Sequence, residues 1–286
     1  MTRNAAGADV DGGGSATPAP ARPSAATRAL WWAADYLYAA RRQLAVVAPP
    51  WAIGRARPTP RGWRTGSPEL PEIVLVPGVY EHWTFLRPLG DALSAAGHRV
   101  TVVHGLGVNR RGIAETSAQL QKLLTKLPAP DSGRVIVAHS KGGLIGKHVL
   151  VSSGAASAAA AEAAVGGDPA DAAASAPPEA GRPALGLLGL VAVATPFGGA
   201  RRARLLIDPS IRAFLPGDAT IVSLGRETSV NGRIVSIFGP YDPHIAEGSA
   251  LDGATNVRVP TPGHFRVLSS PRTHAAVIEG VALLAR

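Results

Sequence analysis

The chain has 286 residues, 46% of them hydrophobic and 17% charged, and it carries a formal net charge of +9. Its lack of cysteine excludes disulfide bonds, thiol catalysis and cysteine-ligated metals. No segment approaches the ~20 uninterrupted apolar residues of a membrane-spanning helix, so we expect a soluble, cytoplasmic protein.

The positive charge is concentrated near the N-terminus. The segment from Arg22 to Arg64 contains eight arginines and a single acid, Asp35. We find no basic stripe with interleaved aromatics, no zinc-finger spacing and no RNP-like segment elsewhere. Nucleic acid is therefore not an expected partner.

The N-terminal quarter of the chain divides into three parts. Residues 1–27 are mostly Ala, Gly, Pro, Ser and Thr, which predicts a disordered tail. Residues 28–48 predict an amphipathic helix with Thr27 as N-cap and a stop at Pro49. A Pro/Arg-rich linker then extends to residue 71. The apolar stripe of the helix consists of Leu30, Ala33, Leu37, Ala40, Leu44 and Val47.

Two placements of this helix are open. A long helix with an apolar stripe usually packs on its own domain. The aromatic residues and the pair Arg41-Arg42 also suit a helix that lies at a membrane surface, which would make the protein membrane-associated.

Residues 72–286 show alternating strand and helix patterns. Short β-branched runs, bounded by Gly, Pro or Asn, are typical of buried parallel strands, and amphipathic stretches lie between them. This order predicts one α/β domain with an open, mainly parallel sheet flanked by helices. The strands are expected at 73–76, 100–103, 135–137, 187–193, 234–238 and 256–259, and helices at 86–96, 116–127 and 275–284.

An Ala/Gly-rich segment at residues 152–183 interrupts the alternation. Alanine propensity allows a helix over 155–165. The glycine and proline pairs farther along favour a floppy surface insertion, and a role as an active-site lid is open.

Ser140 lies in the stretch V-I-V-A-H-S-K-G-G, at the end of a predicted strand and before a predicted helix. A sharp turn there requires small residues two before and two after the serine, and Ala138 and Gly142 occupy these positions. This arrangement predicts a nucleophile elbow, with alanine in place of the first glycine of G-x-S-x-G. A serine that only caps the helix would leave the small flanking residues unexplained.

A serine nucleophile needs a histidine base and a carboxylate, which should follow in the order acid, then histidine, after later strands. Asp242 and His264 satisfy both conditions. The rival histidines, His244 and His274, do not lie in post-strand loops. Of the rival acids, Asp218 and Asp252, the second lies in a turn-like L-D-G setting, where aspartate usually bonds to local backbone.

An acyl-transfer site also needs donors for the oxyanion. The backbone N–H of Lys141 at the helix start is one candidate, and Val79, after Pro77-Gly78, is the other. Tyr80 is the alternative to Val79, and an ordinary turn at Pro77-Gly78 is also open.

These segments together resemble the α/β-hydrolase family, and within it the small bacterial lipases of the Bacillus type that carry A-H-S-x-G-G. The resemblance extends over residues 72–284 and includes T-P-F-G-G at 195–199 and the stretch around His264. It implies the triad Ser140, Asp242 and His264, oxyanion donors at Val79 and Lys141, and neither a metal nor an organic cofactor. The Lys141 side chain departs from the family pattern, and we expect it to point to solvent or to an anionic substrate group.

The function expected from these residues is a serine hydrolase that cleaves carboxylic esters of small-molecule or lipid character through an acyl-enzyme. Acyl transfer to another acceptor would use the same triad. A non-catalytic binding protein of the same fold is the alternative from another class.

Overall fold

The computed structural model describes residues 23–47, 58–165 and 185–286. Most of the predicted disordered tail, Pro49 and residues 166–183 of the predicted insertion therefore lie outside the described residues. Six strands form one sheet in the order β2-β1-β3-β4-β5-β6, and every neighbouring pair is parallel. This confirms the predicted parallel α/β sheet.

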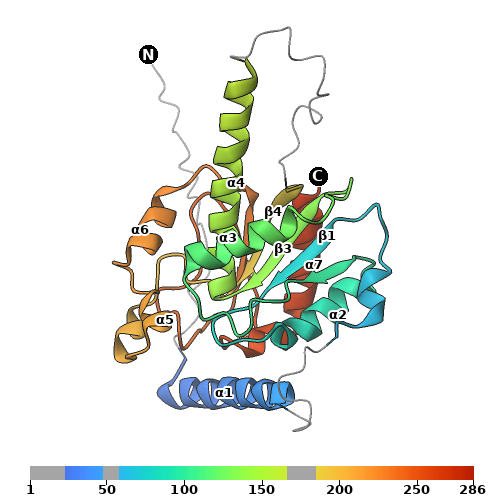
Figure 1. Ribbon diagram of the computed structural model, residues 1–286. Helices are drawn as coiled ribbons and strands as arrows, with labels where there is room; N and C mark the ends of the chain where they lie inside the picture. The colour runs from blue at the N-terminus through green and yellow to red at the C-terminus, as the bar shows by residue number, and fades with distance from the viewer. Residues whose placement is uncertain (1–22, 48–57, 166–184) are drawn as a thin grey trace, which may run out of the picture.

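Helices cover both faces of the sheet (Figure 1). The strands are β1 Glu72–Val76, β2 Val100–Val102, β3 Arg134–His139, β4 Leu187–Val193, β5 Ile234–Phe238 and β6 Thr255–Arg258. The α-helices are α1 Ala25–Val47, α2 Arg87–Ala95, α3 Ile113–Leu124, α4 Lys141–Val165, α5 Pro209–Arg212, α6 Ala219–Arg226 and α7 Pro271–Leu284.

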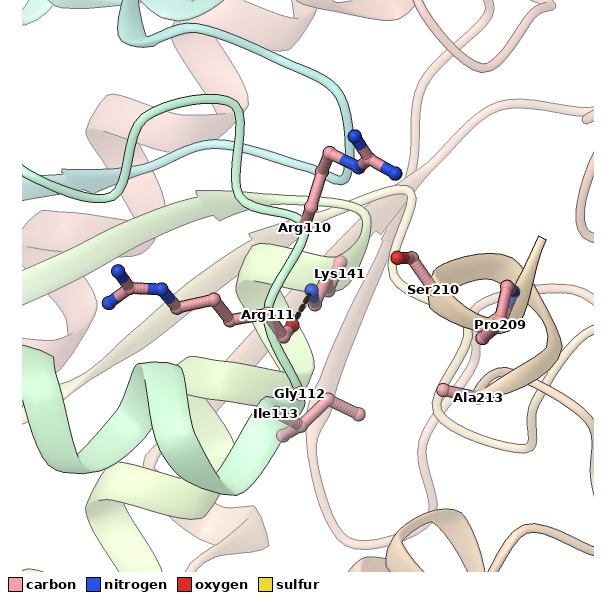
Figure 2. Close-up of a pocket in the computed structure, with 8 residues that line it drawn as sticks. All are labelled: Arg110, Arg111, Gly112, Ile113, Lys141, Pro209, Ser210 and Ala213. Atoms are coloured by element: carbon pink, nitrogen blue, oxygen red, sulfur yellow. Dashed lines mark hydrogen bonds between the residues drawn. The ribbon is translucent and has the colours of Figure 1, made fainter.

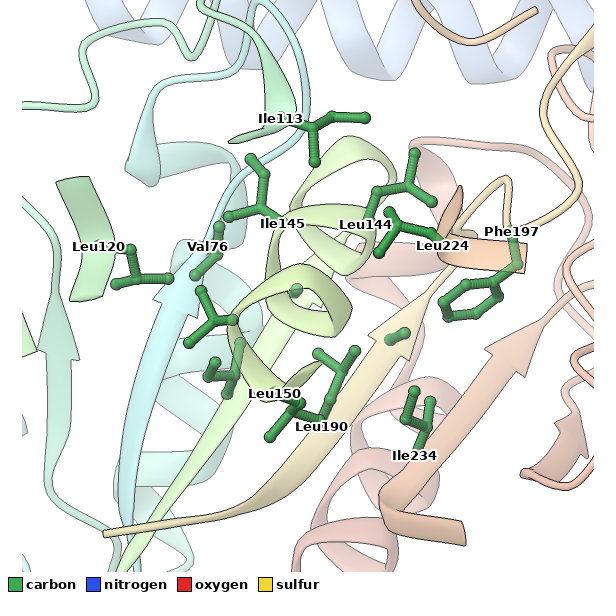
Figure 3. Packing of buried hydrophobic residues seen from close by; sticks show 14 of the residues in the cluster. Val76, Ile113, Leu120, Leu144, Ile145, Leu150, Leu190, Phe197, Leu224 and Ile234 are labelled. Carbon is green, nitrogen blue, oxygen red and sulfur yellow. The ribbon is translucent and has the colours of Figure 1, made fainter. Parts of the chain in front are cut away.

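Alternate strand residues contribute to two separate cores, because successive side chains of a strand point to opposite faces. On one face, Val76 and Leu190 pack with Leu120, Leu144 and Ile145 of α3 and α4 (Figure 3). On the other face, neighbouring strand residues pack against α2 and α7. The carboxyl ends of the strands meet at one edge, where ligands of such folds bind.

Helix α1 starts at Ala25, three residues before the predicted start. The hydroxyl of Ser24, not of Thr27, takes the capping position and accepts a hydrogen bond from the N–H of Thr27 at 3.1 Å. None of the helices within the described residues is long and apolar enough to cross a membrane.

Helix α1 packs on its own domain, but not through the predicted apolar stripe. Leu30, Leu37 and Leu44 are 70%, 72% and 66% exposed. The opposite side carries the fully buried Asp35 and the half-buried Tyr38. This side contacts the short 3-10 helices η3 Trp83–Leu86 and η6 Arg266–Ser269, which follow the ends of β1 and β6. The helix therefore lies over the loops at the carboxyl edge of the sheet (Figure 1).

The predicted linker contains a core residue. Residues Arg61–Arg64 form the 3-10 helix η2, and Trp63 is buried against Trp83 with ring centroids 5.6 Å apart. A Cβ atom at Gly90 would lie 2.5 Å from the Trp63 ring, so the ring can pack here only because residue 90 is glycine. The sequence did not predict the burial of Trp63, because the segment is rich in proline and a single buried aromatic residue produces no periodic pattern.

Helix α4 continues to Val165 and includes residues 152–165 of the predicted insertion. It projects beyond the sheet in Figure 1. Its alanines have the highest helix propensity, and the buried first turns supply the nucleus from which the helix extends. The helix that alanine propensity allows over 155–165 is therefore present, in place of a flexible insertion over this part.

Candidate active site

Ser140 occupies the turn between β3 and α4 with φ of 52°. A Cβ atom at Gly142 would overlap the carbonyl oxygen of Val76, and one at Gly143 would overlap Oγ1 of Thr195. The turn is held by a hydrogen bond from the N–H of Ser140 to the carbonyl of Val193 at 2.9 Å. A non-glycine residue in this backbone region costs about 1–3 kcal/mol, which the packing around the turn must offset.

The three side chains expected to form a triad lie in one hydrogen-bonded row. Nε2 of His264 is 3.0 Å from Oγ of Ser140, and Nδ1 of His264 is 2.7 Å from Oδ2 of Asp242. They come from the turn after β3 and from the loops after β5 and β6, because the carboxyl ends of these parallel strands meet at the same edge.

The rival residues lie in other settings. Asp218 caps α6 by accepting the N–H of Thr220, and Asp252 is exposed on a turn. His274 lies on α7, where Nε2 is 2.8 Å from the carbonyl of Leu268. His244 lies in the loop after β5, beside Asp242, contrary to expectation, and its ring centroid is 4.8 Å from that of His264. Burial, assisted by the charge of His264, lowers the pKa of His244 to about 3, so this ring is neutral at neutral pH.

The charges of Asp242 and His264 stabilise each other. Burial alone would raise the pKa of Asp242, but its contacts with His264 and with the N–H groups of His244 and Ile245 outweigh burial and lower the pKa to about 2. Burial alone would lower the pKa of His264. Asp242 outweighs burial, with smaller contributions from Glu81 and Asp35, and the pKa is raised. The row is therefore arranged to hold a proton on His264.

The two expected oxyanion donors come from the loop after β1 and from the first residue of α4. Lys141 is the first residue of α4, so its N–H has no acceptor within the helix. Val79 follows Gly78, whose N–H donates to Oε2 of Glu81 at 2.7 Å. Within the described residues, the N–H groups of Val79 and Lys141 donate no hydrogen bond. Tyr80, the alternative donor, has φ of 61°.

The Lys141 side chain does not point to solvent, contrary to expectation. It is 1% exposed, and Nζ donates to the carbonyls of Asn109 (2.9 Å) and Arg111. Burial lowers its pKa to about 8. The amide of Asn109 in turn donates to the carbonyl of Pro77 at 2.7 Å. Lys141 thus ties the loop before α3 to the loop that carries Val79.

A cavity of about 190 Å³ lies beside Lys141, between the segment before α3 and helix α5. Figure 2 shows the Lys141 ammonium at its wall, bonded to the Arg111 backbone, with α5 on the opposite side. Its lining residues are Arg110, Arg111, Gly112, Ile113, Lys141, Pro209, Ser210 and Ala213.

Three buried polar residues near His264 were missed by the sequence analysis. His139 Nε2 lies 2.9 Å from the carbonyl of His264, and its Nδ1 lies 2.7 Å from Oε1 of Glu81 without hydrogen-bond geometry. Asp35 of α1 accepts the backbone N–H of His264 at 3.0 Å. The only sequence signal for Asp35 is that it is the single acid in an arginine-rich segment.

Comparison with known proteins finds similarity only at the level of structure. Neither a family model nor a curated protein sequence matches the chain. Aspergillus fumigatus lipase B superposes with a TM-score of 0.59 at 15% identity, over 78% of this chain and 55% of that lipase. The chain therefore spans about half the length of that lipase. A metagenomic carboxyl esterase superposes with a TM-score of 0.47 at 17% identity, over 86% of this chain and 90% of the esterase.

The first of these superpositions agrees with the features described above. The sheet is parallel, Ser140 lies on a tight turn from β3 into α4, and the histidine and carboxylate beside it follow later strands. The chain has the α/β-hydrolase fold.

Proposed function

We propose that this protein is a serine hydrolase that cleaves carboxylic esters. The observation that carries the proposal is the continuous row of Ser140, His264 and Asp242, at 3.0 and 2.7 Å, on a strained turn. The sequence A-H-S-K-G-G and its resemblance to Bacillus-type lipases support the same conclusion.

In the proposed reaction, Oγ of Ser140 attacks the ester carbonyl while its proton passes to Nε2 of His264. The N–H groups of Val79 and Lys141 donate to the developing oxyanion, where one such donor is typically worth about 10²–10³-fold in rate. The tetrahedral intermediate collapses, and the alcohol leaves with the proton from Nε2. A water molecule then gives a proton to Nε2 of His264 and attacks the acyl carbonyl; the bond to Oγ breaks, Oγ of Ser140 takes the proton back from His264, and the acid is released. Asp242 stays ionised throughout and stabilises the imidazolium.

Labelling with a fluorophosphonate probe tests the nucleophile. Wild type and the control Ser94→Ala, which removes a surface hydroxyl bonded to the carbonyl of Gly62, should label equally. Ser140→Ala should not label. Equal labelling of all three proteins, or none of the wild type, would refute the proposal. Release of free acid from a nitrophenyl ester series, with and without an added alcohol acceptor, then separates hydrolysis from acyl transfer.

We also propose that the outer face of α1 binds an anionic membrane surface. Residues seven apart lie within about 20° of each other around a helix, so Leu30, Leu37 and Leu44 form one exposed stripe, with the exposed Arg41 beside it. Leu205 and Ile207, in the segment before α5, are 75% and 93% exposed and are further apolar surface. Apolar stripes with arginines suit anionic lipid headgroups.

Vesicle sedimentation tests this surface. Wild type should bind phosphatidylglycerol-containing vesicles more strongly than pure phosphatidylcholine vesicles. Leu30→Ser/Leu37→Ser/Leu44→Ser should lose most of the binding, whereas the control Val222→Ser, on the exposed side of α6, should retain it. Equal binding by the triple variant, or no binding by wild type, would rule the surface out.

A further inference from the structure

We infer that Asp35 of α1 is a positioning residue that holds the backbone of His264 in its reactive place. The inference rests on the proposed function, since it assigns His264 as the base. Oδ2 of Asp35 accepts the N–H of His264 at 3.0 Å, and Oδ1 accepts the N–H groups of Phe265 and Arg266, both at 2.8 Å. One carboxylate thus binds three consecutive amides, 229 to 231 residues away along the chain.

The charge of Asp35 is compensated by this loop. Asp35 is fully buried, and within the described residues it forms no ion pair with a lysine or arginine. Burying an unpaired carboxylate is costly unless strong hydrogen bonds satisfy it. The three amides supply these bonds, and they also lack other acceptors because they precede or begin η6. The loop amides therefore satisfy the buried carboxylate of α1, and the carboxylate is the acceptor that these amides need.

The loop is shaped to receive the carboxylate. Gly263, the residue before His264, has φ of 110°, and a Cβ atom there would lie 2.5 Å from Oδ1 of Asp35. Its N–H donates to the carbonyl of Tyr241 at 2.8 Å, next to Asp242. Glycine at this position gives both the backbone conformation and the space that the contact requires.

His264 is held from both sides of its backbone. The carbonyl accepts a hydrogen bond from Nε2 of His139, whose ring also contacts Glu81 inside the domain. Among the residues that the structure describes, the N–H is bound only by Asp35 on the separate helix α1. Removing the Asp35 contact would free one end of the His264 backbone and let the ring move relative to Ser140.

A positioning role predicts more than lost stability. The negative charge of Asp35 lies close to the imidazole and favours its protonated form. Replacing this charge should therefore lower the pKa of His264 as well as disturb its position. A helix contact that served stability alone would leave kcat of a folded variant unchanged, so the loss of kcat reports the positioning and the pKa change reports the lost charge.

Asp35→Asn is the decisive variant, because asparagine is nearly isosteric and keeps one oxygen acceptor while it lacks the charge. Asp218→Asn, which also removes a carboxylate that accepts a backbone N–H, is the matched control on α6. We expect Asp35→Asn to lower kcat about ten- to hundredfold with KM changed less than about threefold, since misplacement of a reacting group by about 1 Å costs rates of this size. The acid limb of kcat/KM should move to lower pH. Asp218→Asn should match wild type.

Two measurements on the protein itself separate this inference from the proposed function. The NMR titration of the His264 imidazole does not need activity, and its pKa should be lower in Asp35→Asn than in wild type. If the variant does not fold, hydrogen exchange in wild type decides, because the amides of 264–266 should be as protected as those of α7. The inference is overturned if Asp35→Asn folds with kcat and the His264 pKa unchanged, or if these amides exchange like an exposed loop. An inactive wild type that still shows the pKa difference would refute the ester hydrolase alone.

Discussion

Replacing Asp242 by asparagine changes the hydrogen-bond pattern of the candidate site with little change in shape. In the wild type, Oδ2 accepts from Nδ1 of His264 at 2.7 Å, so Nε2 is free to accept the Ser140 proton. Oδ1 is already bound to the N–H groups of His244 and Ile245, so the asparagine oxygen takes this place and its NH₂ group faces Nδ1. His264 must then carry its proton on Nε2, which is the wrong tautomer for a base.

The expected loss of activity follows from this tautomer. A neutral imidazole with hydrogen on Nε2 cannot accept the serine proton, and the corresponding change in serine proteases lowers kcat by about 10⁴-fold. The control Asp252→Asn should keep wild-type kcat, because that carboxylate lies exposed on a turn.

The same variant should lose stability in a defined pH window. A buried carboxyl group whose pKa falls from 3.8 to about 2 on folding contributes about 2 kcal/mol to the free energy of unfolding. The contribution is full above about pH 4 and is lost as the pH falls through about 2. The difference between wild type and Asp242→Asn should therefore be largest at neutral pH and shrink below about pH 4.

Two assays check these values. Ester hydrolysis gives kcat, and urea unfolding at a series of pH values gives the free energy of unfolding. A kcat for Asp242→Asn within tenfold of wild type would refute its role in orienting His264. A stability difference that stays constant from pH 7 to pH 2 would refute the charge coupling.

Three further predictions concern other parts of the structure. The pKa of His264 is raised above 6.5, so kcat/KM should fall as the pH decreases through a value above 6.5; an acid limb centred below 6 in a pH–rate profile would contradict this. Trp63→Ala should lower the free energy of unfolding in urea by about 3–5 kcal/mol because the ring is fully buried. Replacing the half-exposed Trp32 by alanine should lower it far less, and equal losses would disprove that Trp63 anchors η2. Lys141→Met should cost about 1–3 kcal/mol by leaving two carbonyls without their donor, and it should not change the preference between anionic and neutral esters; a changed preference would show that the ammonium reaches the substrate.

The candidate triad could be predicted from the sequence because its determinants are local. A sharp turn from a strand into a helix needs small residues around Ser140, and this pattern is visible in the sequence. In the structure, a Cβ atom at position 142 or 143 would also overlap atoms of Val76 or Thr195. Asp242 and His264 each follow a strand, and parallel strands bring their carboxyl ends to one edge whatever their spacing in sequence. Chain order together with placement after a strand therefore selected them.

The surroundings of the triad were decided by tertiary structure. The apolar stripe of α1 showed where its leucines lie, but not that the opposite face, with Asp35, would dock on the His264 loop. Lys141 was likewise expected to point to solvent or to an anionic substrate group, whereas carbonyls of another loop bind its ammonium in the interior. A buried charge needs hydrogen-bond partners. For Asp35 and Lys141 distant segments supply them, and a sequence pattern carries no record of which segments meet.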